Sequence, residues 1–270
     1  SEYTTGVVKD DSAYKTTITV ASGVANLYYY CQNHSGMGAE IRTNSTHGST
    51  NFDGSILSVS NANTTSGFSI VKATSPSSGT WSIGHGLNSK PTYIIQKYLA
   101  SSSRWTVWQN HMTSGQYYGL NETDGTRTSG TPFNFTFTDT VIGGNSNYDA
   151  TSTDVIYYVF HDVEGYCKSG TFTGNGSTDG TYIYTGFRPQ FILAKSTGSG
   201  SWHLVDEELD VNPVGYLNAE SNVIYQDYAH YDILSNGFKV RDNGSHTNPL
   251  NTTVFYLAFA RTPFKFANAR

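Results

Sequence analysis

The sequence predicts an all-β protein in which two tandem related β-sandwich modules, jelly-roll-like, follow a partial β segment at the amino terminus. Composition, short alternating runs and an internal repeat carry this prediction. Only 14% of the residues are charged, and Thr, Tyr, Val and Ile are common. These residue types suit a pleated, half-buried surface. Exposed helix faces need more Ala, Leu, Glu and Lys than this chain contains.

Short apolar runs alternate with turn signals along the chain. Phe133–Thr138 has aromatic residues at every second position, a pattern typical of a half-buried strand. The Asn-Gly pairs at 236–237 and 243–244 favour tight hairpin turns. The only helical candidate is a short turn near residues 206–209. Runs this short, with turns this frequent, are typical of sandwiches and barrels.

An internal repeat divides most of the chain into two halves. The matched landmarks are Pro91 with Pro189, Lys97 with Lys195, Trp105 with Trp202, Gly119–Asn121 with Tyr216–Asn218, and Val155–Phe160 with Val254–Phe259. Their offset of roughly 98 residues fits a small domain better than a solenoid unit. The junction between the halves is short, so we expect the two modules to touch and to hold a fixed angle.

The repeat and the composition together give four segments. Residues 1–43 form the partial β segment, and residues 44–66, rich in Asn, Ser, Thr and Gly, are predicted to be a linker with one candidate strand at residues 56–59. Module 1 is expected to span residues 67–165, and module 2 residues 166–270.

Charge and hydropathy exclude several classes of partner. The net charge is −5 and no basic run stands out, so nucleic acid is not an expected partner. Apolar stretches such as Thr253–Ala260 are too short to cross a bilayer, so we expect no membrane insertion. The two cysteines, Cys31 and Cys167, do not suggest a disulfide scaffold.

The sequence contains no recognisable catalytic constellation. Asp206, Glu207 and Glu208 form the densest acidic cluster, and paired carboxylates could cleave glycosidic bonds. Adjacent residues of a strand point to opposite faces, however, and the matching stretch of module 1, Gln109–His111, has no carboxylate. We therefore predict solvated surface charge, no enzyme activity and no cofactor, and keep a glycan-degrading hydrolase as the alternative.

Aromatic side chains outside the matched landmarks are the candidates for ligand binding. Tyrosine offers contact area at small entropic cost, and a flat ring can stack on a sugar. The candidate residues are Trp108, Tyr117, Tyr118, Tyr225 and Tyr228. Trp105 and Trp202 occupy matching places and are predicted to share a core role instead. His85 is predicted to be a turn histidine that bonds to the backbone.

Several motifs resemble a phage family. Gly84–Leu87, Pro91, Ile94–Lys97 and Trp105 resemble the "GHGL…P…IIVK…W" module of tail fibres and related virion proteins of marine phages, cyanophages especially. A companion module matches Gly174–Gly180, Gly186–Pro189, Ile233–Lys239 and Ala258–Lys265. Together the two modules cover roughly three quarters of the chain.

This resemblance implies a non-enzymatic virion structural or adhesion protein, namely a tail fibre, knob or decoration component. Its expected location is the virion surface, which is extracellular. The expected partners are other virion proteins and host-surface glycan. The chain is also expected to form a homo-oligomer, with a trimer favoured because trimers are usual in fibres. In this setting the alternative hydrolase would be of the tailspike type.

The amino-terminal stretch Leu27–Gly38 resembles the last strand and loop of a cupredoxin. The resemblance implies Cys31, His34 and Met37 as copper ligands, a donor set that suits a trigonal copper site. No histidine precedes His34 to complete it, so we predict no bound metal here and keep a copper-binding protein as a further alternative. On this reading Ser1 lies inside a domain whose first half is missing.

Overall fold

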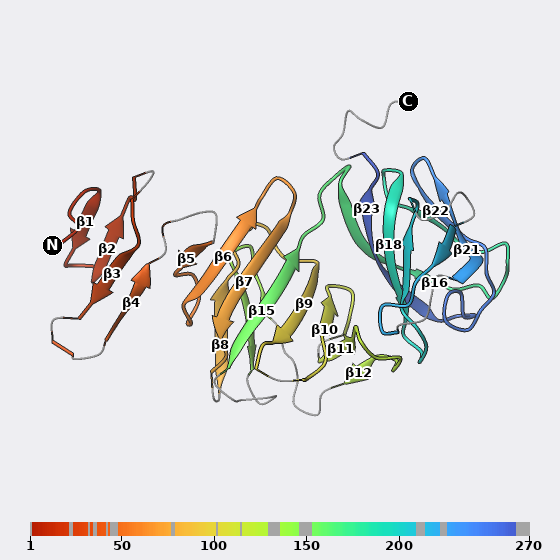
Figure 1. Ribbon diagram of the computed structural model, residues 1–270, viewed down its shortest axis with the longest axis horizontal. Helices are drawn as coiled ribbons and strands as arrows, with labels where there is room; N and C mark the ends of the chain where they lie inside the picture. The colour runs from red at the N-terminus through yellow and green to blue at the C-terminus, as the bar shows by residue number, and fades with distance from the viewer. Residues whose placement is uncertain are drawn as a thin grey trace.

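The computed structural model describes residues 2–21, 24–31, 33–34, 37–41, 43, 48–76, 79–100, 102–113, 115–128, 136–145, 153–208, 214–221 and 226–262. Within these ranges the regular elements are all strands, which confirms the predicted all-β fold. Figure 1 shows three bodies in chain order, made of strands β1–β4, β5–β15 and β16–β23. None of the described residues belongs to a helix that is long and apolar enough to span a membrane.

The amino-terminal body consists of two antiparallel hairpins. β1 (Val7–Asp10) pairs with β2 (Lys15–Ile18), and β3 (Leu27–Tyr30) pairs with β4 (Gly38–Ile41). All side chains of these four strands are half-buried or exposed. Isolated two-stranded hairpins are marginally stable, so this body contributes little to the core, and its relation to a cupredoxin stays a prediction.

Module 1 packs a large sheet against a small one. The large sheet has the order β12-β11-β10-β9-β15-β7-β6-β5, and the small sheet has the order β13-β14-β8. The strands are β5 (Ser49–Asn51), β6 (Ser58–Asn63), β7 (Phe68–Thr74), β8 (Thr80–Gly84), β9 (Tyr93–Tyr98), β10 (Thr106–Gln109), β11 (Gln116–Gly119), β12 (Arg127–Thr128), β13 (Thr136–Phe137), β14 (Val141–Asn145) and β15 (Asp154–Phe160).

The predicted linker at residues 44–66 is wrong, because β5 and β6 lie in this range and extend the large sheet. The candidate strand at residues 56–59 overlaps the start of β6. β6 pairs with β7 along its whole length. Its buried side chains are Ser58 and Ser60, and Ser58 Oγ donates to Gly84 O at 2.8 Å. Small polar residues on the inward face remove the apolar alternation that reveals a half-buried strand in a sequence. Module 1 therefore includes residues 49–63.

Module 2 is a sandwich of two four-stranded sheets. One sheet has the order β16-β23-β18-β19, and the other has the order β17-β22-β21-β20. The strands are β16 (Cys167–Thr173), β17 (Tyr182–Tyr184), β18 (Pro189–Ser196), β19 (His203–Asp206), β20 (Val214–Tyr216), β21 (Gln226–Leu234), β22 (Gly237–Val240) and β23 (Thr253–Ala260). Cys167 of β16 is buried, and it forms no disulfide with Cys31.

The two modules share a strand order. The run β7-β15-β9-β10 of module 1 matches β16-β23-β18-β19 of module 2, and the small sheet β8-β14-β13 matches β17-β22-β21. The repeated lysine has the same role in both modules. Lys97 Nζ donates to Ser103 O, and Lys195 Nζ donates to Gly200 O. The repeat in the sequence thus corresponds to a repeated topology with repeated contacts.

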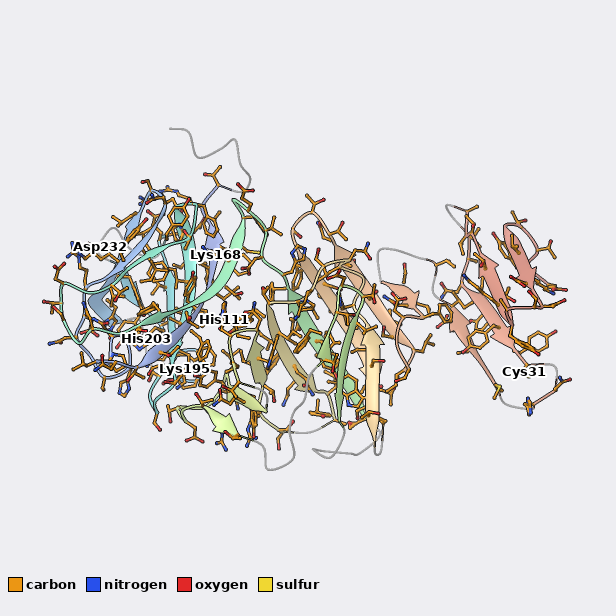
Figure 2. The ribbon with its side chains drawn as sticks, turned by 180° about the vertical axis from the view of Figure 1, so that it is seen from behind. Cys31, His111, Lys168, Lys195, His203 and Asp232 are labelled. Carbon is orange, nitrogen blue, oxygen red and sulfur yellow. The ribbon has the colours of Figure 1, made fainter. Side chains whose placement is uncertain are left out.

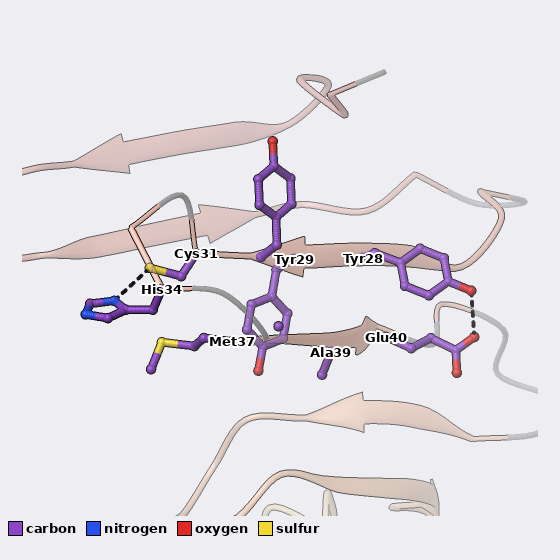
Figure 3. Close-up of a pocket in the computed structure, with 9 residues that line it drawn as sticks. Tyr28, Tyr29, Cys31, His34, Met37, Ala39 and Glu40 are labelled. Carbon is purple, nitrogen blue, oxygen red and sulfur yellow. Dashed lines mark hydrogen bonds between the residues drawn. The ribbon is translucent and has the colours of Figure 1, made fainter.

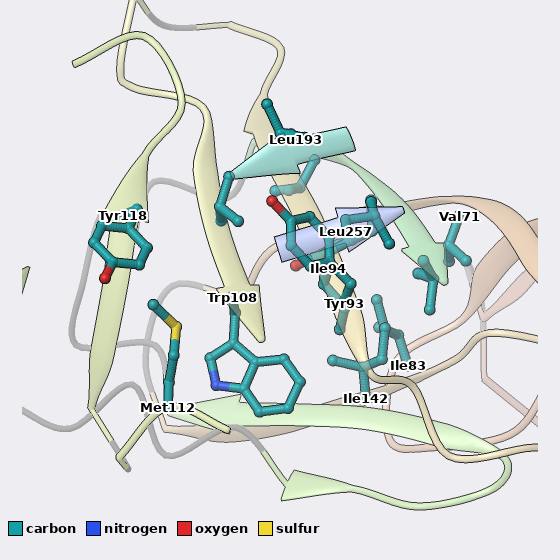
Figure 4. Packing of buried hydrophobic residues seen from close by; sticks show 14 of the residues in the cluster. Val71, Ile83, Tyr93, Ile94, Trp108, Met112, Tyr118, Ile142, Leu193 and Leu257 are labelled. Atoms are coloured by element: carbon teal, nitrogen blue, oxygen red, sulfur yellow. The ribbon is translucent and has the colours of Figure 1, made fainter. Parts of the chain in front are cut away.

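β23 has a hydrophobic core on each side. Phe255 and Leu257 belong to the same cluster as the module 1 core, whereas Val254, Tyr256 and Ala258 belong to a second cluster inside module 2. Figure 4 shows Leu257 among the side chains of the first cluster. A strand covered on both faces has a continuous apolar sequence rather than an alternating one, as residues 253–260 do.

Buried polar groups also join the modules. Gln109 Nε2 donates to the main-chain oxygens of Gly170 and Tyr256, both at 3.0 Å. Trp202 Nε1 donates to Gly119 O at 2.9 Å. Breaking such buried bonds would leave desolvated groups unpaired. The modules therefore touch, as the short junction predicts, and these buried bonds oppose a change in their relative orientation.

Candidate functional site

Three of the five predicted ligand-binding aromatics are core residues. Trp108, Tyr117 and Tyr118 expose only 8%, 4% and 1% of their surface. Trp108 stacks on Phe137 with the ring centroids 3.7 Å apart, and Tyr118 meets Trp202 edge to face at 5.6 Å. A buried ring has no free face for an external ligand, so the prediction is wrong for these three residues.

The burial of Trp108 follows from the position of β10. All four of its side chains are buried, because one face of the strand packs inside module 1 and the other meets module 2. The remaining two candidates are not tested. Tyr225 lies outside the described residues, and of Tyr228 only its place in β21 is described.

Of the residues predicted to be structural, Trp202 and His85 are buried, whereas Trp105 belongs to neither hydrophobic cluster and does not share the core role of Trp202. Trp202 is 2% exposed, and Trp105, which is half-buried, stacks on Tyr158 at 6.3 Å. His85 is fully buried. Its Nδ1 accepts from the N–H of Leu87 at 3.2 Å, and its Nε2 lies 3.2 Å from Thr138 O. Burial lowers the pKa of His85, so the neutral imidazole fits these two bonds.

The acidic cluster is engaged in ion pairs. The guanidinium of Arg188 donates to both carboxylate oxygens of Glu207, and Arg261 Nη1 lies 3.5 Å from Glu207 Oε2. The side chain of Glu207 is 8% exposed, whereas that of Glu208 is 63% exposed. The Glu207 carboxylate is therefore a buried ion-pair partner rather than the solvated charge that the sequence suggested. A glycosidase needs two carboxylates that face a shared cleft.

A groove runs along one side of module 2, between the edges of its two sheets. β16 is the edge strand of one sheet, and β17 is the edge strand of the other. The groove has a volume of about 550 Å³. It is lined by residues 168–173, residues 181–184, His111 and Tyr256. Figure 2 shows Lys168 and His111 near the junction of the two modules.

Two tyrosines of β17 face outward at this groove. Tyr182 and Tyr184 expose 43% and 59% of their surface, whereas Ile183 between them is 6% exposed. The hydroxyl of Tyr182 donates to Asn236 Oδ1 at 2.7 Å, and Lys168 Nζ lies 5.4 Å from the centroid of the Tyr184 ring. Sequence reasoning missed these tyrosines, although the Tyr-Ile-Tyr alternation places both of them opposite the core.

Side chains bridge the groove at both of its ends. Lys168 Nζ donates to Tyr184 O, and Thr181 Oγ1 donates to Thr173 O, both at 3.0 Å. None of the described residues that line the groove is an aspartate or a glutamate. The groove thus offers hydrogen-bonding groups and aromatic faces, but no carboxylate pair for acid–base catalysis.

The cupredoxin-like loop forms a separate open pocket of about 470 Å³ (Figure 3). Cys31, His34 and Met37 line it, and Cys31 Sγ lies 3.3 Å from His34 Nδ1. A trigonal copper site needs a second imidazole beside the thiolate, and the described residues that line this pocket supply only one histidine. No group of three or more His, Cys, Asp or Glu among the described residues could hold a metal. The donor set therefore does not fit copper.

Titratable side chains also gather inside module 2. The rings of His203 and His230 meet edge to face at 5.1 Å, and His230 Nδ1 lies 2.8 Å from Asp242 Oδ2. Neither ring nitrogen of His203 has a hydrogen-bond partner among the described residues. Burial, and then the nearby His230, lower the pKa of His203 to about 3. His203 is 4% exposed, so this cluster is closed to external ligands.

Comparisons with known proteins identify a family. No curated protein and no solved structure matches the chain. A family model with the description "Domain of unknown function (DUF7483)" matches residues 31–263. The matched range begins just after β3 and contains both modules and the groove. Because the match covers most of the chain, the protein belongs to the DUF7483 family.

Proposed function

We propose that this protein is a non-enzymatic structural and adhesion component of a bacteriophage virion, such as a tail fibre, knob or decoration protein. The similarity of Gly84–Leu87 and the following landmarks to phage virion modules supports the virion setting. The groove of module 2 carries the functional part of the proposal, because it presents outward tyrosines on a body whose two modules share a core.

The groove favours binding over catalysis. Tyrosine gives contact area at small entropic cost, and the described lining has no carboxylate. In the densest acidic cluster, Asp206–Glu208, the carboxylate of Glu207 is paired with Arg188. The expected partners are other virion proteins and host-surface glycan, at the outer, extracellular surface of the particle.

The amino-terminal body supports the proposal of a homo-oligomer. Val8, Tyr14, Tyr28 and Tyr30 expose between 64% and 98% of their surface. Apolar groups gathered at one end of a molecule favour contact with another chain. A symmetric oligomer, with a trimer favoured, would cover them.

Electron microscopy and adsorption assays test this proposal. Antibodies against the purified chain are expected to label the outside of intact phage particles, and the chain itself is expected to compete with phage adsorption to host cells. Host polysaccharide incubated with the chain is expected to release no new sugar ends. Label that appears only after particles are disrupted, or release of sugar ends that Glu207→Ala abolishes, would contradict the proposal.

A further inference from the structure

Module 1 covers two strand edges that no described strand covers in module 2. β6 pairs with β7, the counterpart of β16. The loop between β5 and β6 reaches β8, the counterpart of β17. The N–H of Ile56 donates to Ser82 O at 3.0 Å, and Ile56 forms a bridge with Ile83. Ile56 also packs against the core. The β5–β6 hairpin thus covers the opening between the two sheets of module 1.

The corresponding edge of module 2 has no such strand among the described residues. β23 is the one described strand that pairs with β16, and on the other side, of the described residues, only Cys167 forms a bridge, with Val163. Cys167 bonds with Val163 through both its N–H and its C=O.

Two further backbone groups on the outer side of β16 also have partners. The N–H of Ser169 donates to Asp162 Oδ1 at 2.9 Å, and Thr173 O accepts from Thr181 Oγ1. Antiparallel pairing alternates between the two sides of a strand, so the N–H and C=O of Thr171 also face outward. No described residue pairs with them, and an unpaired edge is a template for a further strand.

We propose that the groove accepts an extended polypeptide strand from a partner virion protein, which adds antiparallel to β16 as β6 adds to β7. This inference rests on the proposed function, because that function makes the groove a contact surface. Main-chain bonds to Thr171 would supply affinity, as in other cases of strand addition.

The lining and the hairpin of module 1 define the chemistry of the occupant. In module 1, Ser58 of β6 donates to Gly84 O. Tyr184 is the residue of module 2 that matches Gly84, and its main-chain oxygen accepts from Lys168 Nζ. A strand that carries a small hydroxyl side chain at that place can take over the bond and release the lysine. In module 1 the branched apolar side chain of Ile56 fills the opening between the sheets and packs against the core. The occupant is therefore a serine- and threonine-rich strand with one branched apolar residue and no basic side chain near Lys168.

A labelled synthetic peptide with the sequence of residues 48–63 is the probe. Fluorescence anisotropy measures its binding to the whole chain and to two matched variants, Thr171→Pro and Thr171→Ala. Both variants lose the threonine side chain, but only proline loses the N–H. Proline is tolerated on an edge strand where the N–H faces outward, and circular dichroism verifies that each variant folds.

The peptide is expected to bind the wild type and Thr171→Ala with affinities within about twofold, and Thr171→Pro about tenfold more weakly, as expected for one lost hydrogen bond. No binding to the wild type beyond that of a scrambled peptide, or equal binding to both variants, would overturn strand addition. Virion labelling and adsorption competition are separate readouts. If both persist while the peptide result fails, strand addition is wrong and the virion role stands. Host glycan whose binding depends on Tyr184 but not on the N–H of Thr171 would also overturn it.

Discussion

At the scale of single residues, His203 and Thr106 show how matching places diverge. Thr106 begins β10 and His203 begins β19, and both side chains are buried. The histidine has no hydrogen-bond partner among the described residues for either ring nitrogen. Its folded pKa is lowered to about 3 by burial and by His230. In the unfolded chain the same imidazole binds a proton near its usual pKa of about 6.5.

This difference in pKa predicts that the protein loses stability in mild acid. The folded state keeps His203 neutral while the unfolded state takes up a proton, so this contribution is fully present above about pH 6.5 and declines toward pH 3. Between pH 7.5 and pH 5 the free energy of unfolding should fall by about 2 kcal/mol from His203 alone. Urea denaturation at a series of pH values measures this loss.

Thr106, the module 1 residue at the matching place, suggests the test variant His203→Thr. It should reduce the loss of unfolding free energy between pH 7.5 and pH 5, because it removes the buried imidazole. An unaltered slope in His203→Thr would show that other groups cause the acid sensitivity.

The Glu207 ion pair gives a second prediction for single residues. Glu207→Ala leaves the partly buried Arg188 without its main partner, and the free energy of unfolding should fall by about 1–3 kcal/mol. Glu208→Ala, at a side chain that is 63% exposed, should change it by less than about 0.5 kcal/mol. Urea denaturation measures the free energy of unfolding of both variants. Equal effects would show that the pair with Arg188 is not stabilising.

At the scale of elements, the β5–β6 hairpin is part of the module 1 sandwich and not a linker. Ile56 lies against the first core, so Ile56→Ala should lower the free energy of unfolding by about 1–2 kcal/mol, less than for a fully buried isoleucine. Phe52→Ala is the control, because Phe52 is 57% exposed. An effect of Ile56→Ala no larger than that of the control, measured by thermal unfolding, would mean that residues 44–66 behave as a linker after all.

The sequence indicates some elements and conceals others for physical reasons. The continuous apolar run of β23 and the turn between Leu234 and Gly237 follow from local patterns, and that hairpin is confirmed. The second Asn-Gly pair, Asn243-Gly244, lies instead in the loop between β22 and β23. β6 is indicated only at its start, by the candidate strand at residues 56–59, because its inward side chains are serines. The strand predicted at residues 133–138 and the turn near 206–209 lie partly outside the described residues.

The candidate site is harder to predict than the fold. The Tyr-Ile-Tyr alternation could have indicated Tyr182 and Tyr184, because a two-residue period places both outside when Ile183 is inside. The burial of Trp108 and Tyr118 depends on contacts with distant segments, namely Phe137 and Trp202. The open edge of β16 appears only when the strand orders of the two modules are compared, and no local pattern contains that information.

At the scale of the whole molecule, the continuous first core predicts that both modules unfold together. Side chains of module 2 such as Leu193, Trp202 and Leu257 belong to the cluster that fills module 1. Separating the modules would expose that apolar surface and the buried Gln109 bonds. Calorimetry of the whole chain should therefore show one thermal unfolding transition for strands β5–β23.

Leu257→Ala tests this coupling, since Leu257 lies in β23 of module 2 but contributes to the core of module 1. The substitution should lower the free energy of unfolding by about 2–5 kcal/mol and move the single transition to lower temperature as a whole. Leu250→Ala, at a side chain that is 65% exposed, should leave it in place. Two separate transitions, of which Leu257→Ala shifts only one, would show that the modules unfold independently despite the side chains they share. A single shifted transition would show that the side chains shared between the modules make their unfolding cooperative.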